Sequence, residues 1–286
     1  RGIPNLHSLY FRLEDAIDWI GEQAAALPQP YFSYFHLLPP HEPYTTHRDY
    51  IDMFADGWKP QEKPTNFTSQ GTGQGFLNQE RRHYDEFVAF VDAEIGRLFA
   101  QMEADGVLDN TYVVLTSDHG ELFERGIRGH VTPALYDPLL NVPLLIHKPG
   151  QQQREDVFAH TSAVDLLPTF LQITGQPIPD WVDGEVLPTF GTAELASDRS
   201  TFALEAKSNP KQAPLTKATS VLVKDEYKLI YYLGYRDEEL FELYNVANDP
   251  EEMTNLIDTQ TAVAADLQQE LKSRLAAANE PFQRPA

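Results

Sequence analysis

The chain has 286 residues, enough to bury one large core or a core with a small appended domain. Its 43 acidic residues against 22 basic ones give a formal net charge of −21, which argues against a nucleic-acid-binding surface. No cysteine is present, so disulfides and thiolate metal sites are excluded within this stretch, and no apolar run reaches the roughly 18 residues of a membrane span. An anionic ligand would therefore need a local cation to overcome the acidic field.

The first segment predicts a helix followed by a strand. Apolar residues recur at helical spacing between Ser8 and Ala26, with acidic residues between them, which is typical of a helix that covers a core. Pro28 and Pro30 end this helix. The aromatic-rich run Tyr31–Phe35 then predicts a strand.

A proline-rich loop, Pro39-Pro40-His41-Glu42-Pro43-Tyr44, follows the predicted strand. Prolines fix a loop and hold its side chains at low entropic cost, so His41 is a candidate functional residue. His36, just before the loop, is better explained as a hydrogen-bonded structural histidine. Residues 57–75 are polar and broken by glycine and proline, which predicts a long surface loop at the mouth of a site.

A long helix is predicted from Gln79 to Asp105, where apolar residues recur at steps of three and four and Gly106 supplies the C-cap. It leads into the β-branched run Tyr112–Thr116, a predicted buried strand. A strand, a helix and a second strand favour a right-handed crossover with parallel strands. The loops that follow the two strands should then emerge at the same edge of the sheet.

Asp118 and His119 follow the predicted strand directly, at the end where open α/β sheets place their ligands. A carboxylate oxygen and an imidazole nitrogen together suit a divalent cation. The same two residues could also form an ordinary hydrogen-bonded loop pair. Gly120 would let the backbone turn sharply beneath them.

The rest of the chain predicts a further buried strand and helix, and then, past Leu195, a smaller region of short alternating strands. A strand is expected at 142–147 and a helix at 163–171, stopped by Gly175. Further along, the pattern predicts a hairpin at 219–223 and 227–232, a pairing segment at 239–244, and a closing amphipathic helix at 261–278.

Several motifs occur in the order that the sulfatase family uses. They are Pro-His-x-Pro-Tyr at 40–44, Asp-His-Gly at 118–120, Gly-His at 129–130, Leu-Tyr-Asp at 135–137, Val-Asp-Leu-Leu-Pro-Thr at 164–169 and the segment 242–256. Over nearly its whole length the chain resembles sulfatases of the alkaline phosphatase superfamily. The resemblance implies an α/β fold with a largely parallel sheet flanked by helices, plus a small C-terminal antiparallel sheet and helix. It places the core at residues 1–195 and the small subdomain at 196–286.

Roles for four residues follow from the resemblance. Asp118 and His119 would bind a divalent metal, most often calcium in this family, with Mg²⁺ or Mn²⁺ as alternatives. His41 would hold the sulfate and assist departure of the alcohol, and His130 would contact the transferred group or a metal-bound oxygen. The lysine that the family has near His130 is not evident, since Thr132 lies close to where it would fall. The implied substrate is a small-molecule or glycan sulfate ester.

The nucleophile of the family is absent from this sequence. Sulfatases make a formylglycine from Cys or Ser in a Cys/Ser-x-Pro-x-Arg motif, and neither a cysteine nor Ser-x-Pro-x-Arg occurs here. We therefore expect the chain to be the C-terminal portion of a sulfatase, inactive by itself, with the nucleophile and two further acidic ligands upstream. Two alternatives stay open: a phosphoryl-transfer member of the superfamily, such as a phosphodiesterase, phosphonate monoester hydrolase or phosphoethanolamine transferase, and a catalytically dead binding domain.

Overall fold

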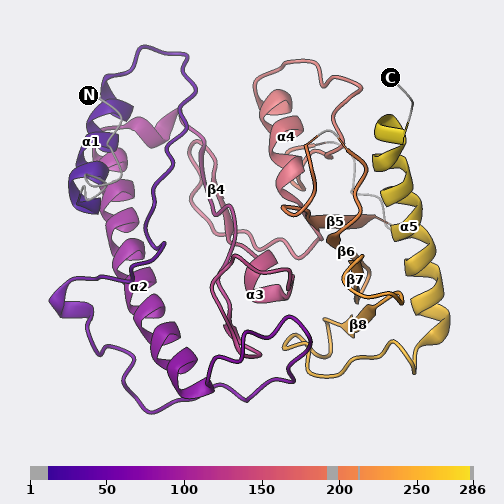
Figure 1. Ribbon diagram of the computed structural model, residues 1–286. Helices are drawn as coiled ribbons and strands as arrows, with labels where there is room; N and C mark the ends of the chain where they lie inside the picture. Colours follow the sequence, from indigo (N-terminus) through magenta and orange to yellow (C-terminus); the bar gives the residue numbers. More distant parts are fainter. Residues whose placement is uncertain (1–11, 192–198, 212, 284–286) are drawn as a thin grey trace. The chain divides into compact units, whose positions relative to one another are not determined.

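The computed structural model describes residues 12–191, 199–211 and 213–283. The described residues form two compact units. The first unit comprises those within 1–129 and 142–154, and the second those within 130–141 and 155–286. Figure 1 traces the chain from indigo through magenta and orange to yellow.

Two helices build the core of the first unit. α1 (Leu13–Ala26) lies beside α2 (Gln74–Ala104), as Figure 1 shows. The predicted apolar stripe of α1 is confirmed, while residues 8–11 of the predicted helix lie outside the described residues. α2 begins before the predicted Gln79, and Gly106 follows it in the left-handed conformation with φ 69°. The side chains buried between the helices are Leu13, Ile17, Ile20, Phe87, Phe90, Leu98 and Met102.

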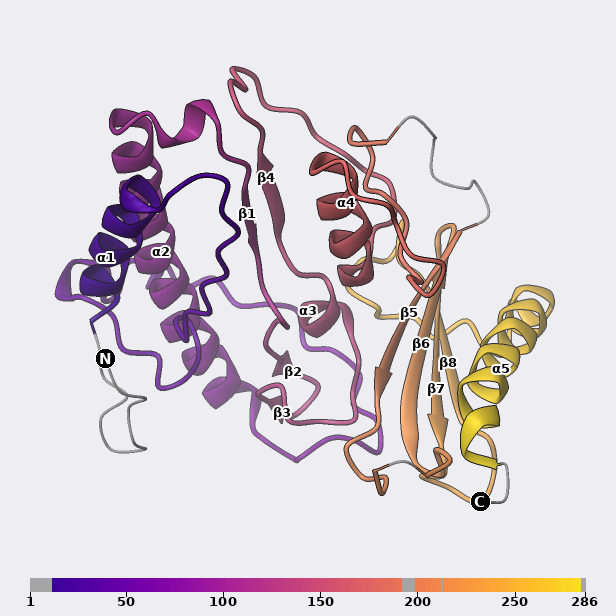
Figure 2. The same ribbon diagram turned by 90° about the horizontal axis from the view of Figure 1, so that it is seen from above.

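The strands of the first unit are short and antiparallel. β1 (Val113–Thr116) pairs with β4 (Leu144–His147), placing Val113 opposite His147, and the two strands run side by side in Figure 2. β2 (Phe123–Glu124) and β3 (Ile127–Arg128) form a small hairpin. Short 3₁₀ turns, η1 (Arg48–Tyr50) and η2 (Val107–Asp109), complete the unit.

The predicted strand at Tyr31–Phe35 is wrong. These residues belong to no strand, and the side chains of Phe32 and Tyr34 are 77% and 76% exposed. A strand is defined by hydrogen bonds to a neighbour, which a local pattern of aromatic residues does not supply. The parallel crossover is not found either, because every strand pair within the described residues is antiparallel.

The predicted loop at 57–75 is confirmed up to Gly73, the residue before α2, and its second half is tied to the β2–β3 hairpin. Lys63 Nζ lies 2.7 Å from Glu124 Oε2, and Arg125 Nη1 donates to the Pro64 carbonyl at 2.8 Å. The backbone nitrogens of Gln70 and Thr72 both donate to the Gly126 carbonyl. The loop is therefore held by specific contacts, although it has no regular secondary structure.

The second unit is organised around an antiparallel sheet with strand order β5-β6-β7-β8, covered by α5 (Figure 2). The predicted hairpin, third strand and closing helix are confirmed. The sheet also contains one strand that the pattern did not predict, β5. The bounds are β5 Ser200–Glu205, β6 Ala218–Lys224, β7 Tyr227–Leu233, β8 Phe241–Asn245 and α5 Thr261–Gln283.

Three short helical segments complete the second unit. α3 (Asp137–Leu140) has Pro138 in its first turn, and η3 (Ala163–Asp165) leads into α4 (Leu166–Ile173). Ser162 and Asp165 form a capping box, so side chains satisfy the first backbone N–H groups of this segment. Gly175 follows α4 with φ 68°, which confirms the predicted stop.

Buried charges join β7 to α3. Lys228 Nζ lies 2.6 Å from Asp137 Oδ1 and 2.7 Å from Glu252 Oε1, and both Lys228 and Glu252 are completely buried. Glu252 Oε2 also accepts a hydrogen bond from the Asp137 backbone nitrogen at 2.9 Å. We call these three residues the Lys228 cluster. Burial raises the pKa of Glu252, and the charge of Lys228 opposes that shift.

The α/β class and the small C-terminal antiparallel sheet with its helix are confirmed. The division at residues 195 and 196 stays a prediction. Across the described residues, no helix is both long enough and apolar enough to cross a membrane.

Candidate functional site

Asp118 and His119 lie just beyond β1, where Ser117 Oγ donates to the His119 carbonyl at 2.6 Å. His119 Nδ1 is 2.8 Å from the Gly120 carbonyl oxygen. In the neutral ring this contact assigns the proton to Nδ1 and leaves the lone pair on Nε2. Nε2 lies 3.8 Å from Asp118 Oδ2, so a nitrogen and an oxygen donor face each other.

This arrangement fits part of a metal coordination sphere. A metal-binding histidine commonly donates its other ring N–H to a carbonyl, as His119 does to Gly120. The Asp118 side chain is 63% exposed and that of His119 35%, so an ion could reach both. Among the residues with described positions, no group of three or more His, Cys, Asp or Glu could hold a metal ion. Two side chains are too few to complete a metal site by themselves.

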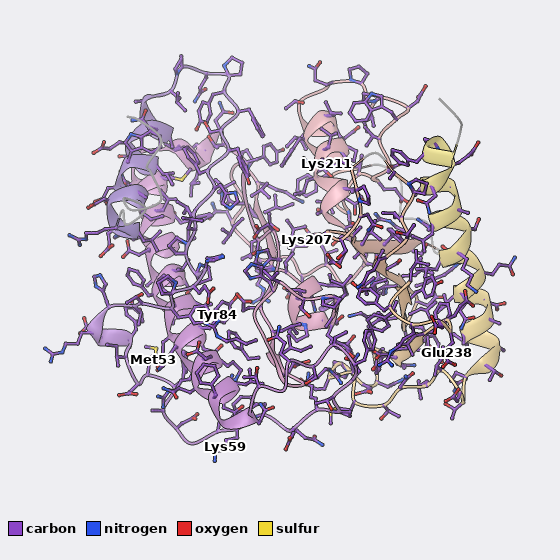
Figure 3. All side chains as sticks on the ribbon, in the orientation of Figure 1. Met53, Lys59, Tyr84, Lys207, Lys211 and Glu238 are labelled. Atoms are coloured by element: carbon purple, nitrogen blue, oxygen red, sulfur yellow. The ribbon has the colours of Figure 1, made fainter. Side chains whose placement is uncertain are left out.

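His41 lies on its own loop in the first unit. Its Nδ1 is 2.8 Å from the carbonyl oxygen of Glu42, and its backbone nitrogen donates to the Leu38 carbonyl. Tyr44 anchors the end of the loop, because its ring packs edge-on against Tyr84 of α2 and Phe123 of β2, with centroids 5.4 and 5.7 Å apart. Tyr84 is labelled on α2 in Figure 3. The loop is thus fastened to the body of the unit.

Arg128 connects this loop to α2. Its Nη2 donates to Glu42 Oε2 at 2.7 Å and its Nε donates to Glu80 Oε2 at 2.8 Å, and we call these residues the Arg128 cluster. The guanidinium also lies over the Tyr44 ring, 5.9 Å from its centroid. An open hollow of about 420 Å³ adjoins the cluster, lined by His41, Glu42, Pro43, Tyr44, Glu80, His83 and Arg128.

The electrostatics of this region follow from burial and ion pairing. Partial burial lowers the pKa of Arg128, but the hydrogen bonds to Glu80 and Glu42 outweigh it and leave that pKa raised. Burial, together with the nearby carboxylate of Glu121, raises the pKa of the Tyr44 hydroxyl, so Tyr44 stays neutral. Two carboxylates surround one guanidinium, which leaves the hollow without an uncompensated positive charge.

The structure brings Asp118 and His119 together, and places His41 on a separate loop of the same unit. His130 belongs to the second unit, where its carbonyl accepts a hydrogen bond from the Thr132 backbone nitrogen at 3.0 Å. The convergence of the four candidate residues on one site stays a prediction. His36 Nδ1 lies 3.3 Å from the Tyr34 hydroxyl, which agrees with a hydrogen-bonded structural role.

Sequence reasoning missed Arg128 and Glu80. Arg128 is separated from Glu80 by 48 positions and from Glu42 by 86, so no local pattern links the three. Arg128 also lies on a strand of only two residues, too short to show an alternating pattern. The sequence offered one indication of a special role for Arg128, namely that it is the single arginine between the glycines at 126 and 129.

Comparisons with solved structures define the class of fold. A phosphonate monoester hydrolase from Silicibacter pomeroyi matches with a TM-score of 0.74 and 24% identity, covering 98% of this chain and 65% of that one. A second structure, solved with its substrate D-glucosamine-2-N,6-O-disulfate, matches with a TM-score of 0.54 and 27% identity, covering 76% of this chain and 45% of that one. The chain therefore shares the fold of these two structures.

The sequence comparisons identify the family. The sulfatase family model matches residues 11–176, and the model of the N-sulphoglucosamine sulphohydrolase C-terminal region matches residues 132–280. Arylsulfatase K of Bos taurus is 28% identical over 300 residues, covering 90% of this chain and 53% of its own length. The chain belongs to the sulfatase family, whose members generally use a divalent metal. It spans about half the length of the curated relatives it matches.

Proposed function

We propose that this chain is the C-terminal portion of a metal-dependent sulfatase that hydrolyses a sulfate ester. The observation that carries the proposal is the Asp118–His119 pair at the end of β1, in a chain of the sulfatase family. The His119 ring is already oriented by the Gly120 carbonyl, with Nε2 toward Asp118. This is the donor set and the tautomer that a metal ligand needs.

Asp118 and His119 would hold the metal, with calcium as the first candidate and Mg²⁺ or Mn²⁺ as alternatives. When bound, such a cation supplies positive charge beside the oxygens on which negative charge develops as the ester bond breaks. Asp118 contributes a hard anionic oxygen and His119 a neutral nitrogen. We place the nucleophile, a formylglycine, and the remaining acidic ligands upstream of residue 1.

His41 would hold the sulfate and donate a proton to the departing alcohol oxygen. The contact from Nδ1 to the Glu42 carbonyl leaves Nε2 as the atom that can face the substrate. In the doubly protonated ring Nδ1–H stays on the Glu42 carbonyl while Nε2–H is given to the departing oxygen as the ester bond breaks. His130 would contact the transferred group or an oxygen of the metal site.

The substrate would be a small-molecule or glycan sulfate ester. The structural relative solved with a sulfated glucosamine supports the glycan class, and the arylsulfatase relatives support ester hydrolysis. A phosphoryl-transfer activity is the second candidate, favoured by the fold match to a phosphonate monoester hydrolase. The upstream nucleophile separates the candidates: Cys-x-Pro-x-Arg favours the sulfatase, a Thr or Ser nucleophile the phosphoryl transferase, and neither one a binding domain.

The metal role is tested with Asp118→Asn in the full-length protein. The substitution keeps the geometry and removes the charge, so we expect bound metal and turnover to fall together and excess metal to restore part of the activity. Metal analysis and aryl sulfate hydrolysis provide the measurements. Asp109→Asn, at an exposed acid of the same unit, is the matched control and should change neither. Full metal content in Asp118→Asn would exclude Asp118 as a ligand.

The role of His41 is tested with His41→Ala. We expect unchanged metal content and a turnover about 10²–10⁴ lower, as is typical for loss of a positioned acid. The loss should be smallest for aryl sulfates with good leaving groups, because these need no proton. Rates on a series of aryl sulfates and metal analysis check this. Loss of the metal, or a defect that is the same for every leaving group, would contradict the assignment.

A further inference from the structure

The two polar groups of Glu42 point to a connection between Arg128 and His41. The Glu42 carbonyl oxygen lies 2.8 Å from His41 Nδ1, while the Glu42 carboxylate accepts a hydrogen bond from Arg128 at 2.7 Å. We infer that Arg128 is a positioning residue for His41: together with Glu80 it fixes Glu42, and Glu42 orients the imidazole. This inference rests on the proposed role of His41 as the proton donor to the leaving group.

The hydrogen bond to Glu42 sets the orientation of the His41 ring. His41 is exposed, so hydrogen bonds rather than close packing decide how its ring is turned. With Nδ1 directed at the Glu42 carbonyl, Nε2 lies on the opposite side of the ring. A shift of the Glu42 backbone would turn Nε2 away from the leaving oxygen, and a displacement of about 1 Å can cost about 10²-fold in rate.

Arg128 suits this task because its guanidinium is a rigid planar fork. One arm reaches Glu42 on the loop and the other reaches Glu80 on α2, which is itself fixed by the core of the first unit. The guanidinium also lies over the ring of Tyr44, which in turn packs against Tyr84 and Phe123. The loop is therefore held on both sides of Pro43.

The charges decide against direct binding of the substrate's sulfate by Arg128. Two carboxylates lie within 2.8 Å of its nitrogens and together outweigh its single positive charge, so the cluster repels an incoming anion. A positioning role predicts that loss of Arg128 lowers kcat and leaves KM nearly unchanged. A substrate-binding role predicts a rise in KM instead.

The test uses Arg128→Gln in the full-length protein with a series of aryl sulfates. We expect kcat to fall roughly 10- to 100-fold for poor leaving groups and much less for good ones, with a small change in KM. In the His41→Ala background the same substitution should add no further dependence on the leaving group. Arg97→Gln is the matched control, since Arg97 also bridges two carboxylates, Asp18 and Glu94, but does not line the hollow.

Two further measurements guard against a general loss of structure. Arg128→Lys keeps the charge but not the fork, so it should not restore activity. Nitrogen NMR of the His41 ring in its neutral form should show the Nδ1–H tautomer in the wild type and a mixture of tautomers in Arg128→Gln, whatever the activity. An equal loss for all leaving groups, a loss additive with His41→Ala, or an unchanged tautomer would overturn the inference. If His41→Ala itself shows no dependence on the leaving group, the proposed function fails, and the NMR measurement still decides whether Arg128 orients His41.

Discussion

The Lys228 and Arg128 clusters each place one basic side chain between two carboxylates, yet their surroundings differ. Lys228 and Glu252 are completely buried, whereas the Arg128 side chain is 31% exposed and that of Glu42 is 46% exposed. When a buried charge loses its partner, water cannot take the partner's place, whereas water can solvate an exposed charge. The same charge pattern therefore stabilises the fold where it is buried and holds a loop in position where it borders a hollow.

The largest effect is expected from Lys228→Met. The substitution leaves Asp137 and Glu252 without a cation, and we expect the free energy of unfolding to fall by about 3–5 kcal/mol. Denaturant titration measures the change. Lys272→Met is the matched control, since Lys272 pairs with Glu239 on the surface and should lose at most about 1 kcal/mol. Equal losses for the two variants would remove the distinction between the clusters.

A much smaller effect on stability is expected from Arg128→Gln. Water can solvate Glu42 and Glu80 once the guanidinium is gone, so the free energy of unfolding should change by no more than about 1 kcal/mol. The same denaturant titration applies. A loss as large as that of Lys228→Met would show that the Arg128 cluster supports the fold rather than the loop alone.

The smallest effect is expected at Glu270, where the charge pattern is reversed. This carboxylate of α5 lies beside Lys224 and Arg274 and accepts a hydrogen bond from Ser200. Partial burial opposes ionisation, but the bonds from Ser200 and Lys224 outweigh it and lower the pKa of Glu270 below its ordinary 4.5. The stability that ionised Glu270 contributes to the fold is therefore fully present above pH 4.5 and is lost as the pH falls through the lowered pKa.

We expect Glu270→Gln to lower the free energy of unfolding by at most about 1 kcal/mol at pH 7, because the side chain is 27% exposed. The difference from the wild type should shrink as the pH falls below 4.5. Denaturant titrations at pH 7 and at about pH 3 check this. A difference that is independent of pH would mean that shape rather than charge matters at this position.

Local patterns predicted the elements that depend on local contacts. The helix at 261–278 and the hairpin at 219–232 are specified by the spacing of their own apolar residues, and both were found. The strand expected at Tyr31–Phe35 was not, because a strand needs a neighbour that periodicity does not identify. β5 was missed since its sequence, Ser-Thr-Phe-Ala-Leu-Glu, alternates only weakly and gains its order from pairing with β6.

The candidate site shows the same division. Asp118 and His119 could be proposed from the sequence because they are adjacent and follow a recognisable strand, and their contact at 3.8 Å follows from that adjacency. The Arg128 cluster joins a loop, a helix and a strand, and only the folded chain brings its three residues together. Contacts between residues far apart in the sequence depend on the topology of the fold, which local sequence patterns do not specify.

The burial of Lys228 also bears on how this sequence can evolve. Loss of Lys228 alone removes the cation beside the buried Glu252, so that single step is selected against even where a fully apolar trio would fold well. Loss of one carboxylate leaves the other paired with Lys228 and is easier to tolerate. Relatives that lack the lysine should therefore also lack the buried carboxylate at position 252, whereas positions 42, 80 and 128, nearer to water, are freer to change one at a time.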